Sequence, residues 1–247
     1  MESILSPHYA GPPFELFGAS HLWTILAMAI VGVVIIRAGM AGGESLRRGL
    51  RWTMVGIFLF WEIEWQVWYV ATGLWTVQGQ LPLHLCSIMI WVATYGLAMQ
   101  DERVYPLIYF FGIAGSFQAV ITPDAVFDFP HVEFLNTMIS HSLLVIVGFW
   151  IVLVGRYRPT WRDMAMALVT LNVYALVVYP IDVAIDANYL YVVAKPATAS
   201  LYDLFPDWPW YLLITEVIAA AIFAAMCWPF NRVSVTQAVQ RVSSESD

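Results

Sequence analysis

Apolar runs long enough to cross a lipid bilayer recur along this chain, and they limit its fold more than any other feature. A hydrocarbon core about 30 Å thick needs roughly 20 residues of helix. Seven runs come near that length, at residues 20–38, 51–74, 82–99, 104–122, 132–154, 161–181 and 209–229. Charged residues make up 12% of the chain, whereas a soluble domain carries about 25%. We therefore predict an all-α polytopic membrane protein with seven transmembrane helices in one bundle.

The basic residues are spread very unevenly over the connections between these runs. With seven spans, all of the 11 Lys and Arg residues except Lys195 fall on one side of the membrane. Because loops rich in Lys and Arg stay in the cytoplasm, we predict an outside N-terminus and a cytoplasmic C-terminus. Six or eight spans would break this asymmetry. The prediction is a single transmembrane domain over residues 1–232, followed by a flexible cytoplasmic tail over 233–247.

Polar and ionisable side chains occur inside the predicted spans, where they are costly and usually face a bundle interior, a cavity or a partner. At about 1.5 Å per residue, Cys86 lies about 6 Å below the outer end of its span, and His141 lies about 14 Å below the outer end of its own. These positions predict a cavity in the outer half of the membrane, beneath the long connection 182–208. The residues predicted to bind or orient a substrate there are His84, Glu62, Glu64, Gln118, Asn136, Asn172, Asp182, Glu216 and Trp210.

Helical spacing separates the two glutamates of the second span. Glu62 and Gln66 stack at i and i+4, whereas Glu64 points elsewhere, so we expect the two carboxylates to have different partners. Two cysteines are too few for a disulfide framework, and no Cys/His array has the spacing of a zinc site. We predict no metal and no cofactor. The acidic balance, a net charge of −7, does not favour nucleic acid as a partner.

Three motifs, in order, carry a family resemblance: LPLHLCSI (81–88), FPHVEFLNTMISHSLL (129–144) and NYLYVVAKPATASLYDLFPDWPWYLL (188–213). They resemble the YwaF-like family of bacterial integral membrane proteins, which is similar to the eukaryotic transmembrane acyltransferase family that remodels ether phospholipids. The resemblance implies a location in the bacterial cytoplasmic (inner) membrane and a phospholipid substrate. It also implies Cys86 as nucleophile, His141 as its partner and an acyl thioester intermediate. The third motif departs from the family, because FPDWPWY lacks the glycine-containing turn expected before WPW.

The residues themselves admit this chemistry. Cys86 lies near a helix start marked by Pro82, where the positive end of the helix dipole favours a thiolate. His141 is the predicted base, with Glu62 or Glu216 fixing its tautomer. The alternatives are a proton-linked transporter or a seven-helix ligand sensor that uses the same Glu/His cluster, or a membrane protein in which these groups only tie helices together. The sequence leaves the oligomeric state open.

Overall fold

The computed structural model describes residues 4–196 and 201–244, with residues 201 and 232–244 described by their backbone alone. Regular secondary structure in these residues is helical, apart from an isolated β-bridge between Pro13 and Phe127. The long helices are α1 (Ala19–Ala41), α2 (Glu44–Thr72), α3 (Leu85–Met99), α6 (Val132–Leu153), α7 (Trp161–Ile185) and α8 (Trp210–Ser244). A further helix is built from η1 (Glu102–Val104), α4 (Tyr105–Phe110), the π-helical turn η2 (Phe111–Gly115) and α5 (Ser116–Ile121). Short 3-10 turns, η3 (Tyr189–Tyr191) and η4 (Leu201–Leu204), lie between α7 and α8.

Within the described residues, five helical segments are long and apolar enough to cross a membrane: Ala19–Ala41, Glu102–Ile121, Val132–Leu153, Trp161–Ile185 and Trp210–Asn231. Each coincides with a predicted span, so the prediction of a polytopic, all-helical membrane protein is confirmed at this level. The two other predicted spans coincide with α2 and α3. Helix α2 is long but carries charges at both its start and its centre, and α3 has 15 residues.

Several helix bounds differ from the prediction, and the reasons are local. Helix α3 starts at Leu85 rather than at Pro82, because the hydroxyl of Tyr189 accepts from the Leu81 N–H and holds the preceding residues in a turn. Helix α8 continues to Ser244, through most of the segment predicted as a flexible tail. Residues 231–244 contain neither Gly nor Pro, so nothing in them stops a helix. Residues 245–247 of the predicted tail lie outside the described part of the chain.

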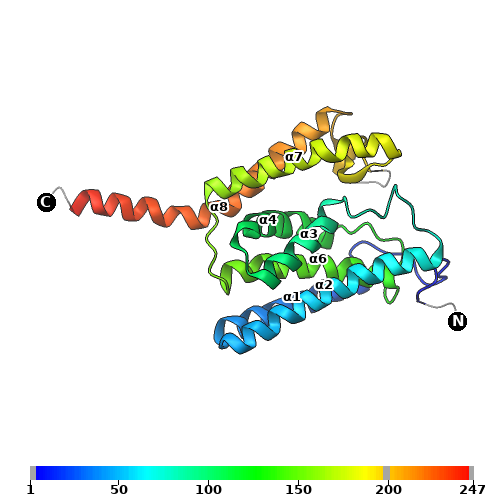
Figure 1. The fold of residues 1–247 in the computed structure, drawn as a ribbon, viewed down its shortest axis with the longest axis horizontal. Helices are drawn as coiled ribbons and strands as arrows, with labels where there is room; N and C mark the ends of the chain where they lie inside the picture. The colour runs from blue at the N-terminus through cyan, green and yellow to red at the C-terminus, as the bar shows by residue number, and fades with distance from the viewer. Residues whose placement is uncertain (1–3, 197–200, 245–247) are drawn as a thin grey trace.

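Helix α6 is the centre of the bundle. It packs against α1, α2, α3 and the whole α4–η2–α5 helix (Figure 1). Its sequence is apolar nearly all round, and Phe134, Met138, Leu144 and Val147 are each fully buried. A helix that is hydrophobic on all faces is expected in the middle of a bundle. Polar groups on α6 therefore face protein.

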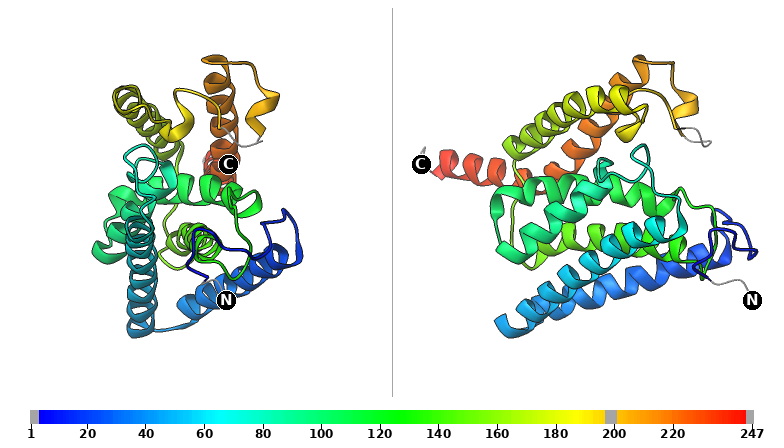
Figure 2. Two further views of the ribbon diagram at one scale, coloured as in Figure 1. Left: turned by 90° about the vertical axis from the view of Figure 1, so that its right-hand side faces the viewer. Right: turned by 45° about the vertical axis from the view of Figure 1, so that its right-hand side comes forward.

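Helices α7 and α8 form a hairpin that packs against one side of the bundle (Figures 1 and 2). A capping box between Thr160 and Asp163 starts α7 and fixes the turn that leads into the hairpin. The hairpin touches the bundle through α4 and η2, where Phe110 and Phe111 stack on Phe223. Most of its remaining surface is apolar and exposed, which suits a lipid-facing element.

Candidate functional site

The site starts with two side chains from different helices. Cys86 is the second residue of α3, and His141 lies in the middle of α6. The Cys86 thiol and the His141 imidazole lie within electrostatic range of each other, close enough for a hydrogen bond to form between them. The predicted pair is therefore brought together, although 55 residues of chain separate its members.

When the positions of Cys86 and His141 are counted from the N-terminal ends of the predicted spans, the two residues lie at different heights. When they are counted from the C-terminal ends of α3 and α6, the two residues lie at nearly the same height. Gln100 and Val154, the C-cap residues of α3 and α6, line the same cavity, so the two helices end at about the same height. At about 1.5 Å per residue, Cys86 lies about 21 Å above Gln100, and His141 about 20 Å above Val154. The predicted depth of about 6 Å for Cys86 assumed a helix beginning at the membrane surface. Because α3 starts at Leu85, a depth counted along a helix from Pro82 does not apply to it.

The tautomer of His141 is fixed by its own helix. Its Nδ1–H donates to the carbonyl oxygen of Thr137, one turn earlier, at 2.7 Å. A neutral imidazole carries one ring proton, so this bond leaves Nε2 with a free lone pair. Neither Glu62 nor Glu216 makes this contact, so the expectation that a glutamate orients His141 is wrong. The result is still a base whose accepting nitrogen is available to a thiol.

Ser116 is a third member that the predicted site did not include. Its hydroxyl is fully buried and has no partner of standard geometry among the described residues, yet it lies close enough to interact with Cys86. It follows the π-helical turn η2, and such turns often occur at functional sites. The turn packs tightly on α6: a Cβ on Gly148 would meet Ile113 Cγ1 at 2.5 Å, and one on Gly112 would meet the Leu144 carbonyl oxygen at 3.2 Å. The two glycines of FGIAGS (111–116) are the sequence feature that could have indicated this close packing of η2 on α6.

The connection between α7 and α8 covers the outer side of the pair. The His84 ring, at the N-cap of α3, contacts the rings of Tyr189 and Tyr191 at 5.0 and 5.6 Å. Tyr191 lies within electrostatic range of Cys86, and burial raises the pKa of its hydroxyl, which therefore stays neutral. His84 thus packs against the two tyrosines of the connection. The first-turn N–H groups of α3, which have no intrahelical partner, lie next to Cys86.

The two glutamates of α2 have different neighbours. Glu62 is buried and lies within interaction range of the Trp91 indole on α3. The Asn136 amide donates to Glu64 Oε2 at 3.4 Å and to the Trp61 carbonyl oxygen at 2.8 Å. These contacts tie α2 to α3 and α6, which gives all three predicted site residues a structural role beside the pair.

The remaining predicted site residues lie away from Cys86 and His141. The Asn172 amide donates to Glu216 Oε1 at 2.8 Å, which links α7 to α8. Asp182 is fully buried near Tyr189, and its carboxylate has no hydrogen bond of standard geometry among the described residues. Gln118 and Trp210 are exposed on α5 and α8. The predicted polar residues therefore do not form one site. They make several separate contacts, and Cys86 and His141 are the pair suited to chemistry.

The donor set at the pair is one sulfur, one imidazole and one hydroxyl. Within the described part of the chain, no three His, Cys, Asp or Glu side chains gather as ligands of a metal ion would. The other cysteine, Cys227, is buried in the middle of α8 and donates to the Thr160 carbonyl oxygen at 3.4 Å. The two thiols have different surroundings, and Cys86 is the one that faces a base.

The fold and this pair define a class: a multi-pass, all-helical membrane protein with a thiol–imidazole pair between its central helices. The chain belongs to the TMEM164 family, whose family model matches residues 16–227. That range contains every helix up to the middle of α8 and all residues of the pair. The chain matches none of the curated proteins and none of the solved structures with which it was compared.

Proposed function

We propose that this protein is a cysteine-dependent acyltransferase, or acyl hydrolase, that acts on phospholipid in the membrane. The observation that carries the proposal is the Cys86–His141 contact, with the imidazole proton held on Nδ1 by Thr137. A thiol becomes a nucleophile only as its thiolate, so it needs a base within reach. Nε2 of His141 is such a base.

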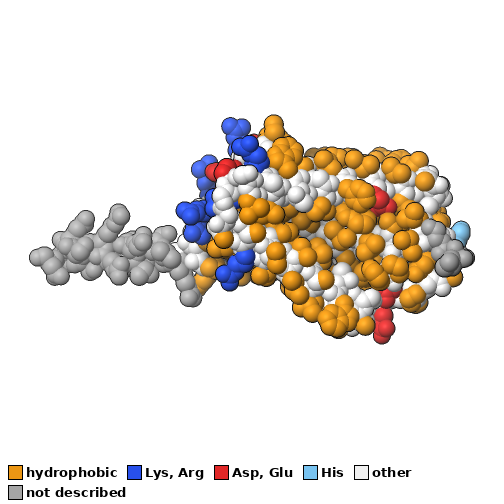
Figure 3. Space-filling model, turned by 90° about the horizontal axis from the view of Figure 1, so that it is seen from below, with side chains coloured by type: hydrophobic (Ala, Val, Ile, Leu, Met, Phe, Trp, Pro, Cys, Tyr) orange, Lys and Arg blue, Asp and Glu red, His pale blue; other side chains and the backbone are white. Residues whose placement is uncertain are grey.

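The proposed membrane placement has seven spans, with α2 and α3 added to the five apolar segments. Arginines gather at the end of the bundle where α1, α3 and α6 end, whereas the apolar surface covers its middle (Figure 3). This distribution supports an outside N-terminus and a cytoplasmic C-terminus. The resemblance to bacterial membrane proteins supports the cytoplasmic membrane as the location. Cys86 then lies inside the bilayer, among the acyl chains rather than the headgroups.

In the first half-reaction, Nε2 of His141 takes the proton of the Cys86 thiol, and the sulfur attacks the ester carbonyl carbon of a donor phospholipid. The first-turn N–H groups of α3 point at the oxyanion that forms. As this intermediate collapses, the ester C–O bond breaks, and His141 returns its proton to the leaving hydroxyl. The products are a lysophospholipid and an acyl thioester on Cys86.

In the second half-reaction, Nε2 takes the proton of an acceptor hydroxyl, either on a lysophospholipid or on water. The acceptor oxygen attacks the thioester carbonyl carbon, the C–S bond breaks, and the proton returns to sulfur. A lysophospholipid acceptor gives acyl transfer, and water gives hydrolysis. The fully buried Ser116 hydroxyl lies beside the sulfur in both halves and is available to stabilise its anionic form.

Acyl exchange between a labelled phospholipid and a lysophospholipid, measured with purified protein, tests the proposal. Cys86→Ala and His141→Ala should each abolish the exchange, and Cys227→Ala is the matched thiol control that should retain it. Exchange that survives the loss of both Cys86 and His141 would end the acyltransferase proposal.

The second candidate is a proton-linked transporter or ligand sensor. The observation in its favour is the burial of two carboxyl groups, Glu62 and Asp182, which are 6% and 0% exposed. Flux in proteoliposomes that is lost in Glu62→Gln but unchanged in Cys86→Ala would support this candidate over acyl transfer.

A further inference from the structure

A polar cavity lies at the opposite end of the bundle from Cys86. It has a volume of about 120 Å³ and is formed where the start of α2 meets the ends of α3 and α6 and the start of α4. A single water needs roughly 10–15 Å³ of such space, so the cavity has room for a small polyatomic ion with water. It lies about 21 Å along α3 from Cys86, so it is a separate site.

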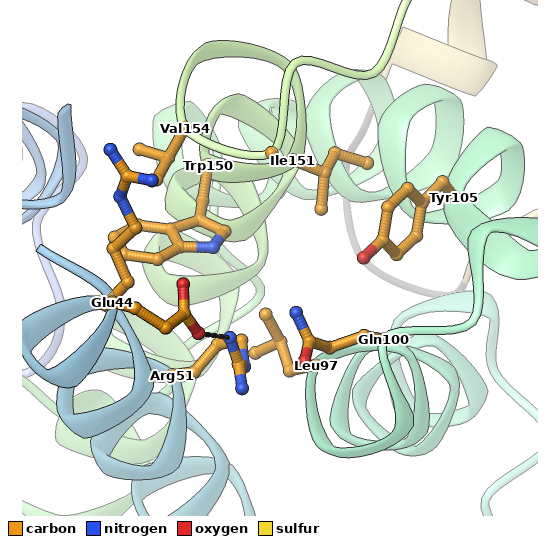
Figure 4. A pocket seen from close by; sticks show the side chains of 10 residues that line it. Glu44, Arg51, Leu97, Gln100, Tyr105, Trp150, Ile151 and Val154 are labelled. Carbon is orange, nitrogen blue, oxygen red and sulfur yellow. Dashed lines mark ion pairs between the residues drawn. The ribbon is translucent and has the colours of Figure 1, made fainter.

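The polar groups of the cavity are mostly hydrogen-bond donors that converge on one space. Figure 4 shows the Gln100 amide and the Tyr105 hydroxyl turned toward the opening, with Arg51 across from them. Arg47 lines the same space, and Tyr105 lies within electrostatic range of Arg51. Glu44 is the acidic residue of the lining, so two guanidinium groups face one carboxylate there.

Arg51 is the residue of the cavity lining that has a buried polar side-chain atom without a hydrogen-bond partner among the described residues. Its side chain is only 12% exposed, and its Nε–H is buried with no hydrogen-bond partner among the described residues. Its ion pair with Glu44 is long, at 3.6 Å, and that glutamate side chain is 62% exposed. A guanidinium has five N–H donors, and a buried donor left unpaired costs about 1–3 kcal/mol. The arrangement is that of a binding residue without its ligand.

The nearby helix ends do not use these donors. Two carbonyls in the last turn of α6 are already bonded, because the Gly155 N–H donates to the Trp150 oxygen at 3.0 Å and the Tyr157 N–H to the Ile151 oxygen at 2.9 Å. The Nε–H of Arg47 donates to the Gly39 carbonyl oxygen at 2.8 Å, which caps the end of α1. The Arg51 donors are therefore available to a ligand that carries oxygen acceptors.

We propose that this cavity binds a phosphate group, with Arg51 as the principal contact and Tyr105 and Gln100 as neutral donors. Guanidinium groups bind phosphate oxygens through paired, charge-assisted hydrogen bonds. The cavity opens at the arginine-rich end of the bundle, at the level of the headgroups of one leaflet, where basic pockets between helices bind anionic lipids. The phosphate can belong to an anionic phospholipid or to a soluble ion. The site is independent of the proposed acyl transfer.

Lipid retention in native mass spectrometry of the full-length protein tests the proposal, with phosphatidylglycerol compared against phosphatidylcholine. Arg51→Gln should weaken phosphatidylglycerol retention by about tenfold or more, since a charged hydrogen bond is lost. Tyr105→Phe, which keeps the ring and removes one neutral donor, should weaken it by about twofold to tenfold. Arg48→Gln is the matched control: it removes the same charge from an exposed neighbour on α2 and should bind like the wild type.

The source of the phosphate is resolved by competition with excess inorganic phosphate, against chloride at equal ionic strength. If phosphate displaces the lipid, or raises the melting temperature of the wild type but not of Arg51→Gln, the cavity accepts the phosphate group itself. If phosphate has no effect while lipid retention depends on Arg51, the site requires the lipid. The proposal is overturned if Arg51→Gln and Tyr105→Phe both bind like the wild type with either ligand. It is also overturned if Arg48→Gln loses as much binding as Arg51→Gln.

Discussion

His141 donates its Nδ1 hydrogen to the Thr137 carbonyl oxygen, 2.7 Å away and one turn earlier on α6. A side chain that bonds to its own helix is held by the most rigid element available to it. The bond leaves Nε2 as the ring nitrogen available to the α3 thiol, and it requires no second side chain that a mutation could remove. The proposed chemistry depends on this relationship.

Replacing the imidazole while keeping a polar side chain should separate catalysis from packing. We expect His141→Gln to lower the acyl-exchange rate by about 10²-fold or more, because general-base assistance contributes about that much. The melting temperature should change little. His84→Gln should have a smaller effect on the rate, since the His84 ring stacks on Tyr189 and Tyr191. Equal losses in the two variants would contradict the assignment of His141 as the base.

The close approach of η2 to α6 should be sensitive to a single side chain. Gly148→Val places carbon where Ile113 already lies, at 2.5 Å from the first added atom, and should cost about 1–3 kcal/mol. Because η2 leads directly into Ser116, this variant should also lose acyl exchange. Gly56→Ala on α2 is the control, since nothing lies within 4 Å of the added atom, and it should be neutral or stabilising. Thermal unfolding in detergent measures both, and similar stabilities would refute the packing argument.

The α7–α8 hairpin should depend on one interhelical hydrogen bond. Asn172→Leu and Glu216→Leu each remove a partner of the 2.8 Å contact. In a double-mutant cycle we expect a coupling of about 0.6 kcal/mol and no more than about 1.7 kcal/mol, the average and the maximum found for such bonds in a membrane protein. The denaturant midpoints of the wild type, the two single variants and the double variant give this number. Additive effects would show that the bond does not hold the hairpin together.

The N-terminal segment should loosen in acid. His131 is fully buried at the N-cap of α6, and burial lowers its pKa. Its Nε2–H donates to the Ser6 carbonyl oxygen, and its Nδ1 accepts from the Glu133 N–H, so the folded form is neutral. The folded pKa of His131 lies below the ordinary value of about 6.5. At pH values between these two, the unfolded state therefore binds more protons than the folded state. Stability is therefore unaffected above about pH 6.5, and it falls as the pH drops from there through the folded pKa.

Hydrogen exchange, corrected for the intrinsic effect of pH, measures this loosening at the amides of Phe14, Asp128 and Val132. These amides donate across the N-terminal segment to Val126, Pro12 and Ile4. Protection should drop between about pH 7.5 and pH 5 in the wild type. His131→Gln should show little such drop, and an equal drop in both proteins would exclude His131 as the cause.

The sequence predicted the helical segments because apolar length is a local property. It also separated Glu62 from Glu64, since helical spacing decides which way each one points. The pairing of Cys86 with His141 came from motif resemblance. The late start of α3 was not predictable, because it depends on Tyr189, which lies 108 residues from Leu81 along the chain.

Two further parts of the site also escaped prediction. The group that fixes the His141 tautomer is a backbone carbonyl, and carbonyls carry no sequence signature. Ser116 reaches Cys86 through a π-helical turn, whose extra residue changes the direction of every side chain after it. Asn172 and Glu216, predicted at the site, bond to each other because α7 and α8 pair as a hairpin.

The most direct test of the central claim is the mass of the peptide that contains Cys86, measured after brief incubation of the purified protein with donor phospholipid. We expect an added mass equal to one acyl chain. The adduct should be removed by hydroxylamine, as a thioester is, and should be absent from Cys86→Ser, while Cys227→Ser retains it. Acyl exchange with no adduct on Cys86, and undiminished in Cys86→Ser, would contradict the account.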